Sequence, residues 1–207
     1  GGDGAAYDSV AWSIANGNGV PVAFRNGYPL LLLGYVRFVG AVYALVGHSY
    51  FVLGVIQSVL GALACLVLFR IAKVLFDGTV ARVAATFAAV SFSLIFAAVA
   101  IGHQAVDVVL TAFLVWLLIR AIAASGGGSV LRWTGVGIVL GCTILVRETT
   151  AFFGAFLLAW VPLSLRRGRS LGATLPIAAM TLGAVMVVTP FALPTVSSAE
   201  GRLRLQP

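Results

Sequence analysis

Two carboxylates, Asp3 and Asp8, stand close together at the start of a chain that otherwise contains few acidic residues. A carboxylate can act as a general base that takes the proton of a hydroxyl group during a transfer reaction. The segment around them is polar and rich in glycine, whereas most of the remaining chain is apolar. We therefore interpret Asp3 as a candidate reactive group and the apolar helices after it as the scaffold that positions it.

The composition indicates an integral membrane protein. Of 207 residues, 61% are hydrophobic and 9% are charged, whereas a soluble domain carries roughly 25% charged residues. The apolar residues form continuous runs, which favours helices over an alternating membrane barrel. The predicted fold is an all-α, polytopic transmembrane helix bundle of about six spans, with interfacial helices in the first outer loop.

Three segments are expected: an outer loop with amphipathic or interfacial helices over 1–48, a transmembrane bundle over 49–193, and the start of a later outer loop over 194–207. A short helix is predicted over 8–16, with a stop at the Asn and Gly residues after it. Spans are predicted over 50–69, 83–101, 105–119, 135–146, 149–165 and 171–193.

The run 28–46 is long enough to span, but Arg37 lies at its middle. A charge at the bilayer centre costs about 2.5–3.5 kcal/mol on insertion scales. We expect a helix at the membrane interface, with Tyr28, Tyr35 and Tyr43 at headgroup depth. A tilted span with a functional Arg37 is the alternative.

The net charge of +7 does not indicate nucleic-acid binding, because the cations lie in short clusters between apolar runs, where topology signals belong. The clusters that mark the cytoplasmic face are Arg70, Lys73 and Arg82; Arg120 and Arg132; and Arg166, Arg167 and Arg169. The outer face then receives five of the six acids, namely Asp3, Asp8, Asp107, Glu148 and Glu200.

Asp107 follows His103 by four residues, so both lie on one helix face at the outer end of a span. An acid at that depth is a functional candidate, and the alternative is a carboxylate stabilised by the helix dipole. Arg147 and Glu148 join two spans. They either pair locally, or Arg147 binds a lipid phosphate through its guanidinium group.

Other candidates have plainer interpretations. Taken by itself, Arg25 favours a headgroup contact. His48 and His103 lack the spacing of metal ligands, so no structural metal is predicted; a divalent metal requirement stays open. Cys65 and Cys142 are interpreted as small packing residues. The row Gly137-xxx-Gly141 predicts close helix packing rather than a nucleotide loop.

In chain order, five motifs resemble those of membrane glycosyltransferases with the GT-C fold, in the bacterial branch related to dolichyl-phosphate-mannose protein mannosyltransferases and the aminoarabinose transferase of lipid A. The motifs are Gly2-Asp3-x-x-x-Tyr7 with Gly17-x-Gly19, Gly27-Tyr28-Pro29-Leu30, Leu75-Phe76-Asp77-Gly78, the helix end Gly141–Arg147, and Thr189-Pro190-Phe191. Departures are Gly4 after Asp3, Asn26 where proline is common, and Phe191 in place of tryptophan.

The resemblance implies an inverting transfer of a sugar from a polyprenyl-phosphate donor to a hydroxyl of a protein or lipid acceptor, at the outer (periplasmic) face of the cytoplasmic membrane. It assigns Asp3 as the catalytic base and Asp107 as an acid that shapes the site. Arg147 and Arg25 are candidates for holding the donor phosphate. Tyr7, His103 and Glu148 are further substrate-binding candidates.

Two other classes are alternatives. A secondary transporter or lipid flippase predicts ionisable residues near the bilayer midplane and internal repeats, whereas the charges here fall at the ends of spans. A non-catalytic membrane subunit would tolerate loss of the Asp3 carboxylate. We expect the segment alone to be inactive, since a first span before Asp3 and the later part of the enzyme would be missing.

Overall fold

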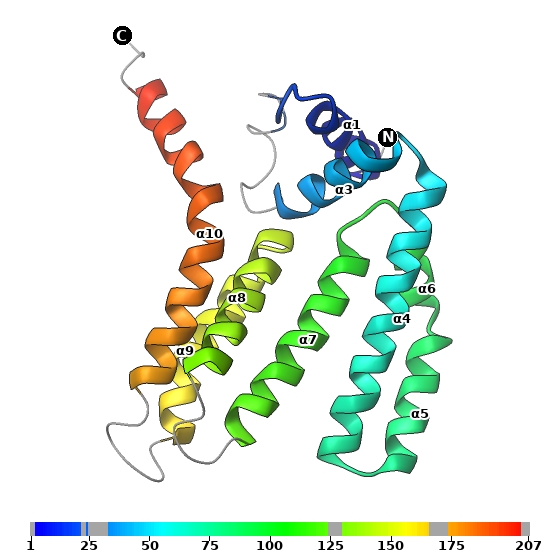
Figure 1. The fold of residues 1–207 in the computed structure, drawn as a ribbon, viewed down its shortest axis with the longest axis vertical. Coiled ribbons are helices and arrows are strands. Elements are labelled where there is room, and N and C mark those ends of the chain that lie inside the picture. The colour runs from blue at the N-terminus through cyan, green and yellow to red at the C-terminus, as the bar shows by residue number, and fades with distance from the viewer. Residues whose placement is uncertain (1–2, 22–23, 25–32, 124–129, 166–173, 204–207) are drawn as a thin grey trace. The chain divides into compact units, whose positions relative to one another are not determined.

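The computed structural model of the chain describes residues 3–21, 24, 33–123, 130–165 and 174–203, and in these residues the regular secondary structure consists of helices joined by short turns (Figure 1). The helices in chain order are α1 (Asp3–Ala15), α3 (Leu33–Val46), α4 (Tyr50–Leu75), α5 (Gly78–Ala89), α6 (Phe92–Val99), α7 (Gln104–Ala123), α8 (Val130–Val146), α9 (Thr150–Leu165) and α10 (Thr174–Leu203). The prediction of an all-α membrane bundle is confirmed.

Two helices of the described residues are long and apolar enough to cross a membrane, α4 and α7. The pair α5 and α6 would add a third span if it is one bent helix. The apolar stretches within α3, α8, α9 and α10 have 17 residues or fewer, the longest in α10 being Leu175–Phe191, which is at or below the lower limit of roughly 17 residues for a span. This count is lower than the six spans predicted.

The chain divides into two compact units. Unit 1 contains α1, α3 from Gly34 onward, α4, α5, α6 and α7 as far as Trp116. Unit 2 contains the remainder of α7 with α8, α9 and α10.

In unit 1, α1 begins at Asp3 rather than at the predicted residue 8. The predicted stop after α1 is confirmed, since Gly17 and Gly19 have φ values of 78° and 70°, a region that favours glycine. A third left-handed residue, Gly47 with φ 82°, separates α3 from α4 at the predicted break.

Two of the three tyrosines expected at headgroup depth are buried by the protein itself. Tyr35 and Tyr43 are 0% and 1% exposed, so their rings contact protein rather than lipid headgroups, and their depth in the membrane stays a prediction. The hydroxyl of each tyrosine donates a hydrogen bond to a side chain of the protein, as a buried tyrosine requires. Tyr28 lies outside the described residues, and Arg37 is exposed on α3.

The α4–α5 turn falls between the predicted spans 50–69 and 83–101, and Asp77 explains why α5 starts at Gly78. Its carboxylate accepts hydrogen bonds from the backbone N–H groups of Thr79 (2.6 Å) and Val80 (2.9 Å). This satisfies two of the N–H groups that a helix start leaves open. Aspartate is among the preferred residues for this role, so the turn could be read from the sequence.

The span predicted over 83–101 is not one continuous helix, because α5 and α6 are separate helices bent by 50°, which makes the pair a broken span or a re-entrant loop. The break falls at Val90 and Ser91, where Ser91 has an extended conformation. The Ser91 carbonyl then accepts the first bonds of α6, from Leu94 and Ile95. Serine is a common residue at helix starts, so Ser91 is a signal for a new helix that the apolar run around it does not reveal.

In unit 2, α8 packs closely on α10 through glycines. A Cβ added to Gly137 would collide with the backbone carbonyl of Met180, and one on Gly183 would lie 2.5 Å from that of Thr134. A Cβ on Gly141 would come within 3.0 Å of the Ala184 carbonyl. The prediction of close packing along Gly137-xxx-Gly141 is confirmed.

At the end of the described chain, α10 stays helical to Leu203, where a polar loop was expected after residue 193. Each proline in this stretch removes one N–H donor, but the sequence offers no residue suited to a left-handed helix end before Gly201. The proline at 194 is therefore a weaker stop signal than the expected loop requires.

Candidate functional site

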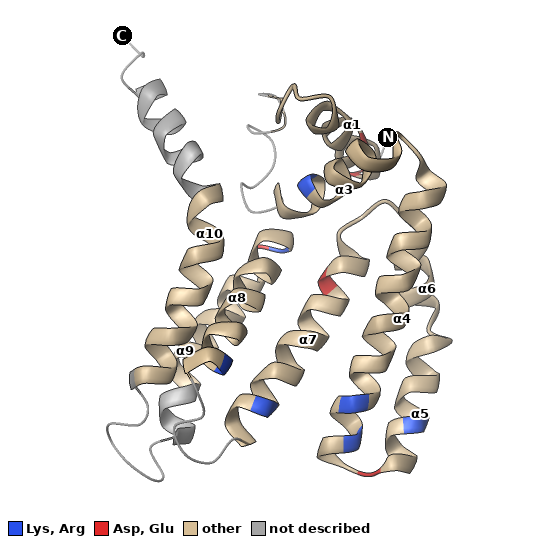
Figure 2. Ribbon diagram, in the orientation of Figure 1, with Lys and Arg blue, Asp and Glu red and all other residues tan. Residues whose placement is uncertain are grey.

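Asp8 of α1 and the two cations of α4 lie at opposite ends of α4. At its first residue, Tyr50 donates a hydrogen bond of 2.8 Å to Asp8 of α1. Arg70 and Lys73 lie in its last turns, next to the turn that contains Asp77 (Figure 2). The predicted separation of the acids of α1 from these cations is thus present within unit 1.

Asp3 occupies the first turn of α1 and is exposed. The next residue, Gly4, lies so close to the α6–α7 turn that an added Cβ would be 3.0 Å from the carbonyl oxygen of Ile101. One turn further on, the buried Tyr7 packs edge-on against His103, with ring centroids 6.5 Å apart. The start of α1 therefore lies against the turn that leads into α7.

Asp107 lies in the first turn of α7, one turn after His103. It is 7% exposed, and its backbone N–H donates to the His103 carbonyl at 2.8 Å. The Thr111 hydroxyl lies 3.4 Å from its carboxylate, which is long for a hydrogen bond. Together with Tyr7, these contacts bring four of the predicted site residues, Asp3, Tyr7, His103 and Asp107, around the α6–α7 turn.

Asp8 is the centre of a cluster that the sequence did not reveal. Its carboxylate accepts hydrogen bonds from the hydroxyls of Tyr43 (2.7 Å) and Tyr50 (2.8 Å), and His48 Nε2 lies 2.9 Å from Oδ1. The ring of Trp12 stacks on His48 at 5.0 Å. This group, the Asp8 cluster, ties α1 to α3, to the α3–α4 turn and to the start of α4.

Two features of the sequence are consistent with the Asp8 cluster. Trp12 follows Asp8 by four residues, so both lie on one face of α1. His48 and Tyr50 flank the break after Gly47, which is where a chain reversal could return to that face. The sequence alone only excludes His48 as a structural metal ligand by its spacing, and identifies Asp8 only as one of the outer acids.

The cluster fixes the charge state of Asp8. Burial by itself would raise the pKa of this carboxyl, but hydrogen bonds from Tyr43, His48 and Tyr50 outweigh it and hold the pKa below its ordinary value. Conversely, burial and the hydrogen bond to Asp8 raise the pKa of Tyr43. Asp8 is thus a carboxylate with its lone pairs engaged, which makes it a poor proton acceptor.

Gln57 supports the same end of unit 1 from inside. It is 0% exposed on α4, and its amide donates to the carbonyls of Ala98 (3.3 Å) and Ala100 (3.0 Å) at the end of α6. Its carbonyl oxygen accepts from the Tyr35 hydroxyl at 3.2 Å. The last carbonyls of a helix lack hydrogen-bond partners within it. The Gln57 side chain supplies partners for two carbonyls at the end of α6 and also links this end to α3.

The remaining candidates lie elsewhere. Arg147 and Glu148 belong to unit 2, at the short break between α8 and α9, and Arg147 Nε donates to the Thr149 hydroxyl at 3.1 Å. Arg25 lies outside the described residues. Within the described part of the chain, no three His, Cys, Asp or Glu side chains form a group that could hold a metal ion.

Comparison with known proteins gives one match. A family model described as dolichyl-phosphate-mannose-protein mannosyltransferase matches residues 34–193. The match covers α3 to α9 and most of α10, and so includes His103, Asp107, Arg147 and Glu148. Asp3, Tyr7 and Asp8 precede it. No curated protein and no solved structure matches the chain.

Proposed function

Since the chain belongs to the dolichyl-phosphate-mannose-protein mannosyltransferase family, we propose that it carries the part of a membrane glycosyltransferase that binds a polyprenyl-phosphate sugar and activates the acceptor hydroxyl. The reaction takes place at the outer face of the cytoplasmic membrane, at the end of unit 1 that holds Asp3, His103 and Asp107. The acceptor is a protein or lipid hydroxyl.

The proposed chemistry is a single displacement with inversion. The acceptor oxygen bonds to the anomeric carbon of the sugar while the bond from that carbon to the phosphate oxygen breaks. The hydroxyl proton goes to the carboxylate of Asp3, and the polyprenyl phosphate leaves with the bonding electrons. A base helps because the hydroxyl loses its proton as the new bond forms.

Asp3 suits the role of base better than Asp8 does. Asp8 is engaged by three donors and its pKa is lowered, so protonation is disfavoured. The Asp3 residue is exposed at the start of α1. The Asp8 cluster in turn holds α1 on α3 and α4, and we assign Asp8 as a positioning residue that fixes where Asp3 lies.

Other residues have supporting roles in the proposal. Asp107, buried at the start of α7, shapes the site next to the acceptor, with Tyr7 and His103 forming its wall. A cation near the phosphate would stabilise the charge that develops on the leaving group. From the resemblance of the sequence motifs alone, we assign this role to Arg147, with Arg25 and Glu148 as further contacts to the donor or its phosphate.

The observation that carries the proposal is the contact of α1 with the α6–α7 turn, which brings Asp3, outside the family match, to the same turn as His103 and Asp107 inside it. The test is transfer from radiolabelled polyprenyl-phosphate mannose in membranes that contain the full-length protein. The variants are Asp3→Asn and, as a matched control, Asp77→Asn at the opposite end of α4. Asparagine caps a helix about as well as aspartate, so α5 should be unaffected.

We expect Asp3→Asn to lower turnover by a factor of roughly 10²–10⁴, the usual contribution of a general base, and Asp77→Asn to stay within about twofold of wild type. Normal transfer by Asp3→Asn, with the protein present at wild-type amounts, would rule out Asp3 as the base.

A further inference from the structure

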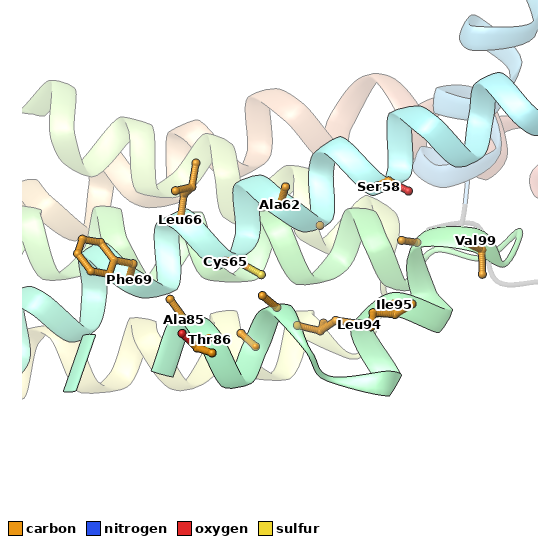
Figure 3. A pocket seen from close by; sticks show the side chains of 14 residues that line it. Ser58, Ala62, Cys65, Leu66, Phe69, Ala85, Thr86, Leu94, Ile95 and Val99 are labelled. Carbon is orange, nitrogen blue, oxygen red and sulfur yellow. The ribbon is translucent and has the colours of Figure 1, made fainter. Parts of the chain in front are cut away.

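The bend between α5 and α6 opens a groove against α4 (Figure 3). Its volume is about 850 Å³, within the range of ~300–1,000 Å³ that is typical of ligand sites. Its lining includes Ser58, Cys65 and Phe69 of α4, Ala85 and Thr86 of α5, and Ile95 of α6. The Ser58 hydroxyl donates to the Gly54 carbonyl of its own helix at 2.8 Å. Its proton therefore does not face the groove, whose lining is mostly apolar.

The length of the groove matches one leaflet of a bilayer. Along α4 it runs from Ser58 to Phe69, which is about 16 Å at the helical rise of ~1.5 Å per residue. The hydrocarbon core of a membrane is about 30 Å thick. One acyl chain that enters from the membrane surface would fill the groove without reaching the other leaflet.

Three exposed basic residues lie just beyond one end of the groove, on the same helices as its lining residues. Arg70 follows the lining residue Leu66 by four positions, and Lys73 follows Phe69 by four, so both lie on the groove face of α4. Side chains of a helix lean toward its N-terminus, which directs these two back toward the groove.

On α5, Arg82 precedes the lining residue Ala85 by three positions and lies on the same face. Its guanidinium group is 3.5 Å from the Thr79 hydroxyl at the start of α5. The nearest acid, Asp77, already accepts two backbone N–H groups of that turn. The end of the groove therefore has a net positive charge.

From this geometry we propose that unit 1 has a binding site for an anionic phospholipid of the leaflet next to the α4–α5 turn. Arg70, Lys73 and Arg82 hold the phosphate, and one acyl chain lies in the groove between α4 and the α5–α6 bend. No Lys or Arg lines this groove or a second hollow, of about 570 Å³, along α4 between Tyr50 and Ala62. The three cations lie beyond the Phe69 end of the groove, whereas Tyr50, at the end of the second hollow, donates a hydrogen bond to the Asp8 carboxylate. The charge thus favours the site at the basic end.

The test is native mass spectrometry of the full-length protein, delipidated in detergent and titrated with phosphatidylglycerol or phosphatidylcholine. Each cation near a membrane surface contributes about fivefold to binding of an anionic lipid, so three contribute on the order of a hundredfold. We expect one phosphatidylglycerol to bind about a hundredfold more tightly than phosphatidylcholine. The Arg70→Gln/Lys73→Gln/Arg82→Gln variant should lose this preference.

A second pair of variants keeps the charges, in case the triple variant inserts incorrectly. Ala62→Phe and Ala85→Phe would fill the groove and should lower phosphatidylglycerol binding at least tenfold. Ala84→Phe changes an exposed alanine of α5 outside the lining and should bind as wild type does. Equal binding of the two lipids by wild type, or unchanged binding by Ala62→Phe and Ala85→Phe, would overturn the proposal. So would displacement of phosphatidylglycerol from the groove by polyprenyl phosphate at lower concentration.

Discussion

The two units of the chain hold their helices together by different means. In unit 1, side-chain hydrogen bonds join the helices: the Asp8 cluster links α1, α3 and α4, and Gln57 links α4 to α3 and α6. In unit 2, α8 and α10 meet through Gly137, Gly141 and Gly183, whose backbones approach too closely for a side chain.

This difference has a physical basis. In a membrane, apolar side chains gain little from leaving lipid for protein, so helices associate through close backbone packing or through hydrogen bonds. Close packing gives a rigid contact with no polar group. Hydrogen bonds bring polar side chains into the helix junctions, and these junctions lie at the end of unit 1 where Asp3 and Asp107 are found.

The largest effect is expected in unit 2, from Gly137→Val. The new side chain would overlap the Met180 carbonyl, and backbone cannot move aside as a flexible side chain can. Overpacking of this kind costs typically 1–3 kcal/mol, and we expect about 3. The measurement is the free energy of unfolding in mixed micelles. Gly135→Val is the control, because a Cβ there meets nothing within 4 Å; equal losses for both would contradict the packing account.

Gln57→Leu tests the buried hydrogen bonds of unit 1. Leucine fills similar space but leaves the carbonyls of Ala98 and Ala100 and the Tyr35 hydroxyl without this partner. An unsatisfied buried group costs about 1–3 kcal/mol, and we expect a loss of about 2 kcal/mol in unfolding free energy. Ser58→Ala removes a neighbouring hydroxyl that bonds only to its own helix and should change little. A Gln57→Leu protein as stable as wild type would show that apolar packing alone holds the end of α6 in place.

Tyr43→Phe tests the Asp8 cluster while keeping the buried ring. A hydrogen bond to a charged group contributes about 1.5–3 kcal/mol, and two other groups still contact Asp8 in this variant, so we expect a loss of about 1.5 kcal/mol. Transfer activity should fall with stability rather than vanish, since Asp8 positions α1. Complete loss of activity in a folded Tyr43→Phe protein would instead place the cluster in the chemistry.

The smallest effect is a pH dependence that belongs to Asp8. Its folded-state pKa is below the ordinary value of 3.8, so its ionised form stabilises the fold at higher pH. That contribution is lost as the pH falls below about 4 toward the lowered pKa. Unfolding measured from pH 6 to pH 3 should show a steeper decline for wild type than for Asp8→Asn. Parallel curves would mean that the folded protein does not favour the ionised carboxyl.

Much of the fold could be predicted from local signals in the sequence. The glycines after α1 and α3, Asp77 at the start of α5 and the spacing of Gly137 and Gly141 each act over a few residues, so their effects are visible in the chain itself. The break at Ser91 and the continuation of α10 were missed, because apolar runs and prolines alone do not fix where a helix ends.

The site was harder to predict, since it depends on contacts between distant segments. The cluster around Asp8 joins residues 35 to 42 positions apart in sequence, and no local pattern specifies such a meeting. The grouping of Asp3, Tyr7, His103 and Asp107 was expected from the predicted topology, and the contact of Tyr7 with His103 agrees with it. The roles of these residues in transfer remain predictions.

The central claim is that the acidic end of unit 1 lies at the outer face of the cytoplasmic membrane, and cysteine accessibility tests it most directly. In full-length protein with Cys65 and Cys142 replaced by alanine, Ser9→Cys on α1 and Thr79→Cys on α5 place exposed thiols at opposite ends of unit 1. A membrane-impermeant maleimide applied to intact cells should label Ser9→Cys, and should label Thr79→Cys only after the membrane is opened. Labelling of Thr79→Cys alone in intact cells would contradict the claim.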